Sequence, residues 1–283
     1  MKYACNTWMY GSFPCWLPSY PLEEVITRIA RIGYDGIEIG CAAPHAWPAY
    51  LTPQKRKAIR SRLVDESLTP VSLLPAPGGG PGHNPASPSL EERNATVDHY
   101  KEVIDLAHEL GARLVLYIGG WQIFGVTREE AWKWTVESLR SIAEHASQAG
   151  IVIAAEPTAA DSNVIEGADD ALQLMRATGQ DNVKVMFDTF HALYRNEVAA
   201  DYVRAMGKDL VHVHAADVDR LPPGDGIVDW PGLIRALREQ NFDGYVTMEI
   251  GFTSRAVEPD RFAQRAINFL KQVEAGNEKD FPR

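Results

Sequence analysis

The feature that most constrains this chain is an eightfold alternation of short apolar runs with longer amphipathic stretches. We expect strands at Tyr3–Thr7, Gly36–Ile39, Pro70–Leu74, Leu114–Ile118, Ile151–Ala155, Val183–Phe187, Leu210–Val213 and Tyr245–Ile250. Strand-length runs that alternate with helix-length segments are typical of parallel βα units. Eight such units predict an α/β protein built as a closed (β/α)8 barrel, the TIM-barrel architecture.

Signals at the expected helix ends support the same repeated unit. Thr127 with Glu130 three positions later is a capping box, and the segment after Pro88 begins a helix that runs to Leu110. Glycines suited to closing a helix stand before four of the strands, at Gly33, Gly111, Gly150 and Gly244. No linker or shift in composition divides the chain, so we expect a single domain over residues 1–283.

Charge and composition exclude several classes of partner. The formal net charge of −10 argues against a nucleic-acid partner, because such binding relies on Lys and Arg neutralising phosphates. No apolar run approaches the roughly 20 residues that span a membrane, and no signal-peptide pattern follows the first residues. The three cysteines, Cys5, Cys15 and Cys41, lack the spacing of a redox or zinc motif. We therefore expect a cytoplasmic protein that acts on a small molecule.

Four expected strands end on a side chain that can bind a metal. These are Glu156, Asp188, His214 and Glu249, which stand at or directly after the ends of the fifth to eighth strands. The carboxyl ends of barrel strands surround one pocket, so these side chains should meet there. Carboxylate oxygens with one imidazole suit Mn²⁺, Mg²⁺ or Co²⁺ better than a structural zinc site. We predict one divalent ion, with Mn²⁺ as the first candidate.

The alternation of side chains along a strand refines this assignment. Residues two apart share a face, so Met186, His212 and Thr247 should also point into the barrel, one layer below the expected ligands. His212 is therefore interpreted as a hydrogen-bonded supporting histidine rather than a ligand.

With these residues in place, the chain resembles the D-tagatose 3-epimerase branch of the xylose isomerase-like barrel superfamily. The match is spread over the second half, in Glu156-Pro, Asp188-Thr-Phe-His191, His212-Val-His214 with Arg220, Gly224-Asp-Gly226 with Asp229-Trp230, and Gly244-Tyr-Val-Thr-Met-Glu249. The first half resembles the family more loosely, through Gly33-Tyr-Asp-Gly-Ile-Glu38. Gly36-Ile-Glu-Ile-Gly, Pro44-His45-Ala and the segment from Glu156 to Ser162-Asn-Val are most similar to fructoselysine 3-epimerase-like members.

The resemblance implies roles for six residues. It makes Glu156, Asp188, His214 and Glu249 the metal ligands, with Glu156 and Glu249 also acting as acid and base. His191 and Arg220 would hold substrate oxygens. Removing a proton beside a carbonyl leaves an enediolate, and epimerisation then needs an acid on the opposite face, which explains the paired glutamates. We expect a sugar-like substrate and a homo-oligomer, either dimer or tetramer.

Other residues at strand ends or in the following loops have open roles: Glu38, Trp8, Trp47, Trp121, His45, His83, Asp217 and Asp219. Glu38 fits either a substrate contact or a buried ion pair. The tryptophans fit a pocket wall or ordinary loop packing, and the two histidines fit a substrate contact or a solvated loop. Asp217 and Asp219 flank Arg220 and are expected to orient it. The tract Pro75–Pro88 fits a lid or a plain surface loop.

Alternative functions remain open within this fold. Inosose isomerases, aldose–ketose isomerases and sugar-acid dehydratases share the expected ligand set. An endonuclease IV-like nuclease would use three zinc ions and needs further histidines at the ends of the third and fourth strands. Those places read Leu74-Pro-Ala-Pro77 and Tyr117-Ile-Gly-Gly120, without histidine. Selection among free sugar, cyclitol and amine-conjugated sugar is expected to depend on the loops that follow the strands.

Overall fold

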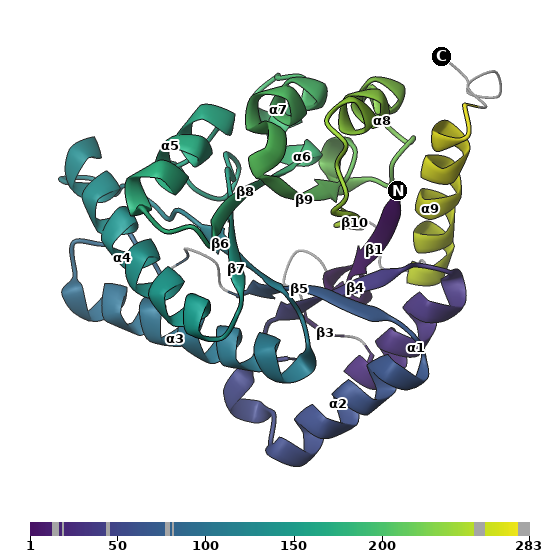
Figure 1. Ribbon diagram of the computed structural model, residues 1–283, viewed down its shortest axis with the longest axis horizontal. Coiled ribbons are helices and arrows are strands. Elements are labelled where there is room, and N and C mark those ends of the chain that lie inside the picture. Colours follow the sequence, from purple (N-terminus) through teal and green to yellow (C-terminus); the bar gives the residue numbers. More distant parts are fainter. Residues whose placement is uncertain are drawn as a thin grey trace.

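The computed structural model describes residues 1–12, 17–18, 20–43, 46–76, 80, 82–251 and 258–276. In this part of the chain, eight parallel strands form a closed barrel in the order β1-β10-β9-β8-β7-β6-β5-β4 (Figure 1). The barrel strands are β1 Lys2–Asn6, β4 Gly36–Cys41, β5 Thr69–Pro75, β6 Leu114–Ile118, β7 Val152–Glu156, β8 Val183–Asp188, β9 Leu210–Ala215 and β10 Tyr245–Met248. The predicted (β/α)8 barrel is confirmed.

The strand ends at the site differ from the expectation. Strands β7 and β8 each end one residue later than expected, at Glu156 and Asp188. The seventh strand continues past Val213 to Ala215, so His214 lies within regular β9. The eighth strand ends at Met248 rather than Ile250, so Glu249 is the first residue beyond β10. A further short pair, β2 Gly11–Ser12 and β3 Leu17–Pro18, is antiparallel and lies outside the barrel sheet.

Helices surround the barrel in Figure 1. They are α1 Leu22–Ile32, α2 Pro53–Asp65, α3 Leu90–Leu110, α4 Arg128–Gln148, α5 Ala168–Thr178, α6 Thr189–Tyr194, α7 Ala199–Met206, α8 Trp230–Glu239 and α9 Pro259–Glu274, with 3-10 turns η1 Thr7–Tyr10, η2 Pro48–Tyr50, η3 Gly207–Asp209 and η4 Val218–Arg220. Helix α9 lies beside β1, where Tyr3 donates a hydrogen bond from its hydroxyl to Glu274 at 2.9 Å. In the described part of the chain, none of these helices is long and apolar enough to cross a membrane.

The helix-end signals act largely as expected. Thr127 and Glu130 form the predicted capping box of α4, and Ser89 caps α3 by accepting from the backbone N–H of Glu92 at 3.2 Å. Gly33, Gly111 and Gly150 have the left-handed backbone that favours glycine. Gly244 does not, and the expectation for it was wrong.

The structure explains in a different way why position 244 is a glycine. A Cβ at this position would lie 2.4 Å from the carbonyl oxygen of Val211 and 2.5 Å from the ring of Phe242. Glycine is required there because β9 passes too close for a side chain, not because of the backbone angle.

The barrel interior contains two kinds of buried side chain. We call the first the apolar sector: Leu74, Leu116, Ala154 and Met186, which pack together from β5 to β8. We call the second the polar sector: Asn6, Glu38, Ser72, His212 and His214, each fully buried, from β1, β4, β5 and β9. The expected inward direction of Met186 and His212 is thus confirmed by their contacts inside the barrel.

Candidate active site

The four predicted strand-end residues meet at one end of the barrel. Glu156 is the last residue of β7, Asp188 the last of β8, His214 lies near the end of β9, and Glu249 directly follows β10. Each offers one nitrogen or oxygen atom, and these four atoms all lie within 4.8 Å of one another. All four side chains are buried. The sequence therefore identified a real cluster.

One ring nitrogen of His214 lies between the two glutamates of this cluster. Its Nδ1 is 3.4 Å from Oε1 of Glu156 and 3.1 Å from Oε2 of Glu249. Neither ring nitrogen of His214 nor Oε1 of Glu156 makes a hydrogen bond of standard geometry, although all three atoms are buried. Buried polar atoms without such a bond are unusual and call for a ligand or ion.

The charge of the cluster also fits a cation. Four buried carboxylates, those of Glu38, Glu156, Asp188 and Glu249, share this end of the barrel with the guanidinium of Arg220 and the imidazoles of the site. Buried negative charge needs positive partners. Oxygen atoms with one imidazole nitrogen are donors that Mn²⁺, Mg²⁺ and Co²⁺ accept. The residues present therefore fit a divalent ion.

Arg220 contacts this cluster directly. Its Nη1 donates to Oδ2 of Asp188 and, at 2.5 Å, to Oε2 of Glu249. Its guanidinium also stacks on the ring of Phe190, 4.3 Å from the ring centroid. The ion-pair partners of Arg220 among the described residues are Asp188, Glu249 and, at 4.0 Å, Asp161, so neither Asp217 nor Asp219 orients it by direct contact.

Asp217 instead organises the loop that carries Arg220. Its carboxylate accepts from five donors, the backbone N–H groups of residues 218, 224, 227 and 228 and the indole Nε1 of Trp230. Within this loop, Asp219 and Arg220 have φ angles of 56° and 62°, which non-glycine residues rarely adopt. Strained backbone of this kind persists only where the surroundings hold it. The hydrogen bonds of Asp217 stabilise this backbone, although no contact joins Asp217 to the guanidinium of Arg220 in the described part of the chain.

His191 lies beside Arg220 in the same buried corner. Its Nδ1 accepts from the backbone N–H of Ala160 at 3.3 Å, which places the proton of the neutral ring on Nε2. Nε2 lies 3.5 Å from a carboxylate oxygen of Asp161 and 3.4 Å from Arg220. Because Nε2–H and the guanidinium are both donors, the contact with Arg220 is not a hydrogen bond. Both groups can instead donate to oxygen atoms of a ligand.

Burial and neighbouring charge shift the pKa values of the cluster in opposite directions. Burial raises the pKa of Asp188 and of Glu156, and nearby cationic groups only partly offset it. Burial also acts to raise the pKa of Glu249, but Arg220 and His214 outweigh it and hold that pKa below its usual range. Neighbouring carboxylates with pKa values pushed apart are a common property of catalytic sites.

A second polar layer lies directly under the cluster. Glu38 accepts from Nδ2 of Asn6 at 2.7 Å and from Oγ of Ser72 at 2.6 Å. Its oxygens also lie 2.8 Å from Nε2 of His214 and 3.1 Å from Nε2 of His212. Of the two roles left open for Glu38, these contacts favour the buried polar pair over a substrate contact. Sequence reasoning missed Asn6 and Ser72, whose only signal is that they share the inward face of their strands.

The remaining loop candidates divide between packing and the site. Trp8 packs against the apolar sector and fills the space above Gly40, where a Cβ would lie 1.9 Å from its ring. Trp47 stacks on His99 with ring centroids 4.5 Å apart, and His83 contacts both rings edge-on. This supports loop packing for Trp47. His45 lies outside the described residues.

The described part of the tract Pro75–Pro88 is packed rather than open. Asn84 is buried and joins this tract to the loop after β6, since its side chain donates to the carbonyl of Trp121 at 2.8 Å. The backbone N–H of Trp121 in turn donates to Asn84 at 2.9 Å. For residues 82–87, the surface-loop interpretation therefore fits better than a lid.

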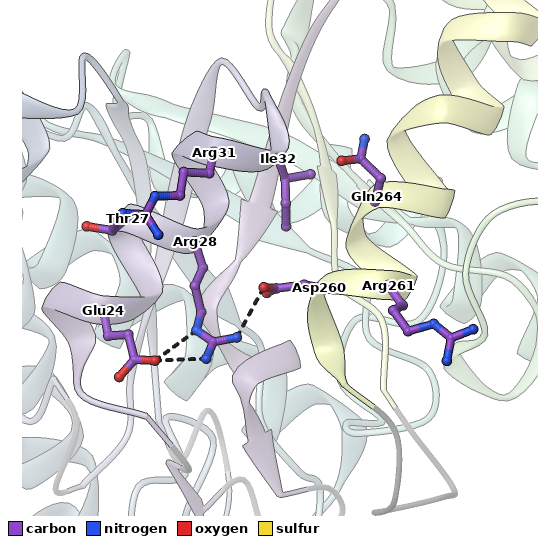
Figure 2. A pocket seen from close by; sticks show the side chains of 8 residues that line it. All are labelled: Glu24, Thr27, Arg28, Arg31, Ile32, Asp260, Arg261 and Gln264. Atoms are coloured by element: carbon purple, nitrogen blue, oxygen red, sulfur yellow. Dashed lines mark hydrogen bonds and ion pairs between the residues drawn. The ribbon is translucent and has the colours of Figure 1, made fainter.

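A separate groove lies on the outer helix layer, away from the strand ends. Figure 2 shows it between α1 and α9, with a volume of ≈ 730 Å³. It is lined by Glu24, Thr27, Arg28, Arg31, Ile32, Asp260, Arg261 and Gln264. Arg28 forms an ion pair with Glu24 on its own helix at 2.9 Å and another across the groove with Asp260 on α9 at 3.1 Å. Its central charges are thus paired with each other, and the predicted site residues lie elsewhere.

Comparison with known proteins agrees with this geometry. The family model described as xylose isomerase-like TIM barrel matches residues 26–273. The chain belongs to this family. Fructoselysine 3-epimerase of Shigella flexneri is 26% identical over 269 residues, covering 93% of this chain and 97% of that protein. D-psicose 3-epimerase of Enterocloster bolteae is 25% identical over 243 residues, covering 83% and 77%.

A solved structure also shares the fold. A D-psicose 3-epimerase with D-tagatose from Clostridium cellulolyticum H10 superposes with a TM-score of 0.85 at 23% identity, covering 97% of this chain and 99% of that one. The resemblance to the sugar 3-epimerase branch, noted in the motifs of the second half, is confirmed by these relatives.

Proposed function

We propose that this protein is a divalent-metal-dependent isomerase that epimerises carbon 3 of a ketose or ketose derivative through an enediolate. Glu156, Asp188, His214 and Glu249 would hold the ion. The observation that carries the proposal is the pair of buried glutamates that approach the same nitrogen of His214 from strands separated by β8 and β9. The family membership and the names of the relatives support the same reaction.

The two glutamates would carry out the proton transfers. One takes the proton from carbon 3, and the electron pair of the broken C–H bond moves toward the carbonyl at carbon 2. The other returns a proton to carbon 3 from the opposite face, which inverts its configuration. A divalent ion in the cluster supplies Lewis-acid stabilisation for the negative charge that develops on two neighbouring substrate oxygens.

Arg220 and His191 would position the substrate. Both present donors at the edge of the cluster, and both are at most 8% exposed. A guanidinium can hold two oxygens at fixed spacing, and the Nε2–H of His191 adds a third donor. Burial of these donors keeps water away from the reacting carbon.

Proton exchange with solvent tests the proposal. Wild-type protein loaded with Mn²⁺ should incorporate one carbon-bound deuterium from heavy water into a ketohexose or fructoselysine, detected by NMR. Glu156→Gln and Glu249→Gln should each lower epimerisation by about 10²–10⁴-fold, because one proton transfer loses its partner. Each variant should still exchange the proton of one epimer, and the two variants should differ in which epimer that is.

Matched controls separate this outcome from indirect effects. Glu144→Gln makes the same chemical change at an exposed position on α4 and should leave the rate unchanged. Metal content is measured in each variant, since both glutamates are also proposed ligands. A metal-replete Glu156→Gln or Glu249→Gln that interconverts both epimers at the wild-type rate contradicts the two-glutamate mechanism. Deuterium exchange only with inososes would favour an inosose isomerase. Return of the proton to carbon 1 would favour an aldose–ketose isomerase, and loss of water from the substrate would favour a dehydratase.

Several finer parts of the proposal rest on the sequence. They are Mn²⁺ as the bound ion, one domain over residues 1–283, a cytoplasmic location and a homo-oligomeric state. Elemental analysis should find about one divalent ion per chain, since the cluster offers one set of four ligands. Three zinc ions per chain would favour the endonuclease alternative. Limited proteolysis and sedimentation test the domain and the oligomer, and fractionation of the source cells tests the location.

A further inference from the structure

The buried carboxylate of Glu38 lies among the other side chains of the polar sector. Its Oε1 faces Nδ2 of Asn6 at 2.7 Å and Nε2 of His214 at 2.8 Å. Its Oε2 faces Oγ of Ser72 at 2.6 Å and Nε2 of His212 at 3.1 Å. Each oxygen therefore has two polar neighbours, and the side chain is 0% exposed.

His214 connects this carboxylate to the candidate metal cluster. Nε2 of His214 faces Glu38, whereas Nδ1 faces Glu156 and Glu249. An imidazole that binds a metal through one nitrogen carries its proton on the other. A carboxylate at Nε2 stabilises that proton, so Nδ1 is left with its lone pair directed at the cluster.

We infer that Glu38 is a positioning residue, which fixes the proton of His214 on Nε2 and thereby selects Nδ1 as the metal-binding nitrogen. The inference rests on the metal site of the proposed function. The four proposed ligands all lie in the second half of the chain. The inference gives Glu38, in the first half, a part in the same site. The other oxygen of Glu38 lies 3.1 Å from Nε2 of His212, so each oxygen of the carboxylate faces one imidazole.

Two other roles for Glu38 conflict with its surroundings. A substrate contact conflicts with the four polar side chains that already face both oxygens of this fully buried carboxylate. A second metal bound by Glu38, His212 and His214 has donor atoms within 4.8 Å of one another. However, the N–H of Asn6 and the O–H of Ser72 point positive hydrogens at the same carboxylate oxygens, which disfavours a cation there.

The test compares Glu38→Gln with wild-type protein, because glutamine keeps the shape of the side chain and removes its charge. Titration calorimetry with Mn²⁺ should show an affinity about 10–100-fold lower in Glu38→Gln, the usual effect of losing the carboxylate partner of a ligating histidine. Glu38→Asp, which keeps the charge, should retain more of the affinity than Glu38→Gln. A purely structural role would lower the unfolding midpoint of the metal-free protein and leave the affinity unchanged.

A spectroscopic readout identifies the nitrogens directly. In protein labelled with ¹⁵N-histidine and loaded with diamagnetic Zn²⁺, the His214 signals should show a metal-bound Nδ1 and a protonated Nε2 with a strongly hydrogen-bonded proton. In Glu38→Gln, this proton should shift upfield. A His214→Gln variant assigns the signals among the eight histidines of the chain.

Three outcomes would overturn the inference: unchanged Mn²⁺ affinity in Glu38→Gln, binding through Nε2 of His214, or two ions per chain with one lost in Glu38→Gln. Failure of the proposed function has a different signature. Wild-type protein that binds the ion as described but does not exchange the substrate proton would remove the epimerase proposal and leave the role of Glu38 intact.

Discussion

The apolar and polar sectors of the barrel interior are equally buried but differ in chemistry. The apolar sector on β5–β8 consists of side chains that gain free energy simply by leaving water, about 1.5–3 kcal/mol for a buried leucine or methionine. The polar sector contains a carboxylate and two imidazoles that lose hydration on burial, and their mutual contacts offset this loss only when well arranged. The first sector stabilises the barrel, and the second fixes the geometry of the candidate site.

This contrast predicts that mutations in the two sectors affect different properties, namely stability in one sector and binding in the other. Changes in the apolar sector should alter the free energy of unfolding without altering the site. Changes in the polar sector and in the cluster above it should alter ion or substrate binding more than stability. The following predictions test the separation, starting with the largest expected effect.

Leu116→Ala should lower the free energy of unfolding by about 2–5 kcal/mol, because it removes a fully buried side chain from the apolar sector and leaves a cavity. Urea denaturation of the metal-free protein measures this loss. Mn²⁺ affinity and the turnover of the folded protein should stay at wild-type values. An affinity loss as large as that of Glu38→Gln would show that the sectors are not independent.

Addition of a divalent ion at 100 times its dissociation constant should stabilise the wild-type protein by about 2.7 kcal/mol, since the ion binds only the folded state. Asp188→Asn should lose most of this gain, because the variant removes one of the four clustered donors. Thermal unfolding with Mn²⁺ and with a chelator measures both. Leu116→Ala is the matched control and should keep the full gain; equal gains in wild type and Asp188→Asn would remove Asp188 from the ligand set.

Arg220→Ala should lower kcat/KM by about 10–100-fold, the equivalent of one lost charged hydrogen bond to the substrate of roughly 1.5–3 kcal/mol. The ion content should not fall, because the variant frees the oxygens of Asp188 and Glu249 that Arg220 occupies. Steady-state kinetics and elemental analysis measure the two effects. If the variant unfolds or loses its ion at unchanged kcat/KM, Arg220 has a structural role instead.

Ser72→Ala should have the smallest effect, about 1 kcal/mol of stability, because it removes one neutral hydrogen-bond donor from Glu38 and leaves the carboxylate and His212 in place. Mn²⁺ affinity should fall much less than in Glu38→Gln. Urea denaturation and calorimetry again give both values. Equal affinity losses in the two variants would mean that the hydroxyl of Ser72, rather than the charge of Glu38, controls His214.

The barrel and the four clustered residues could be predicted because their signals are local. Apolar runs of strand length mark each strand, and polar residues at the carboxyl ends of these runs lie at the end of the barrel that holds active sites. Alternation along a strand then places His212 on the inward face with His214. These predictions do not depend on which side chains of other strands these residues contact across the barrel.

The partners of these side chains were decided only by the closed barrel. Glu38 on β4 meets His212 and His214 on β9 across the interior, and no spacing in the sequence relates strands so far apart. Arg220 likewise pairs with Asp188 and Glu249 rather than with the aspartates next to it, because its strained turn directs the guanidinium inward. Sequence thus determined which faces and strand ends carry polar groups, whereas packing across the barrel decided which of those groups touch and which nitrogen of His214 faces the cluster.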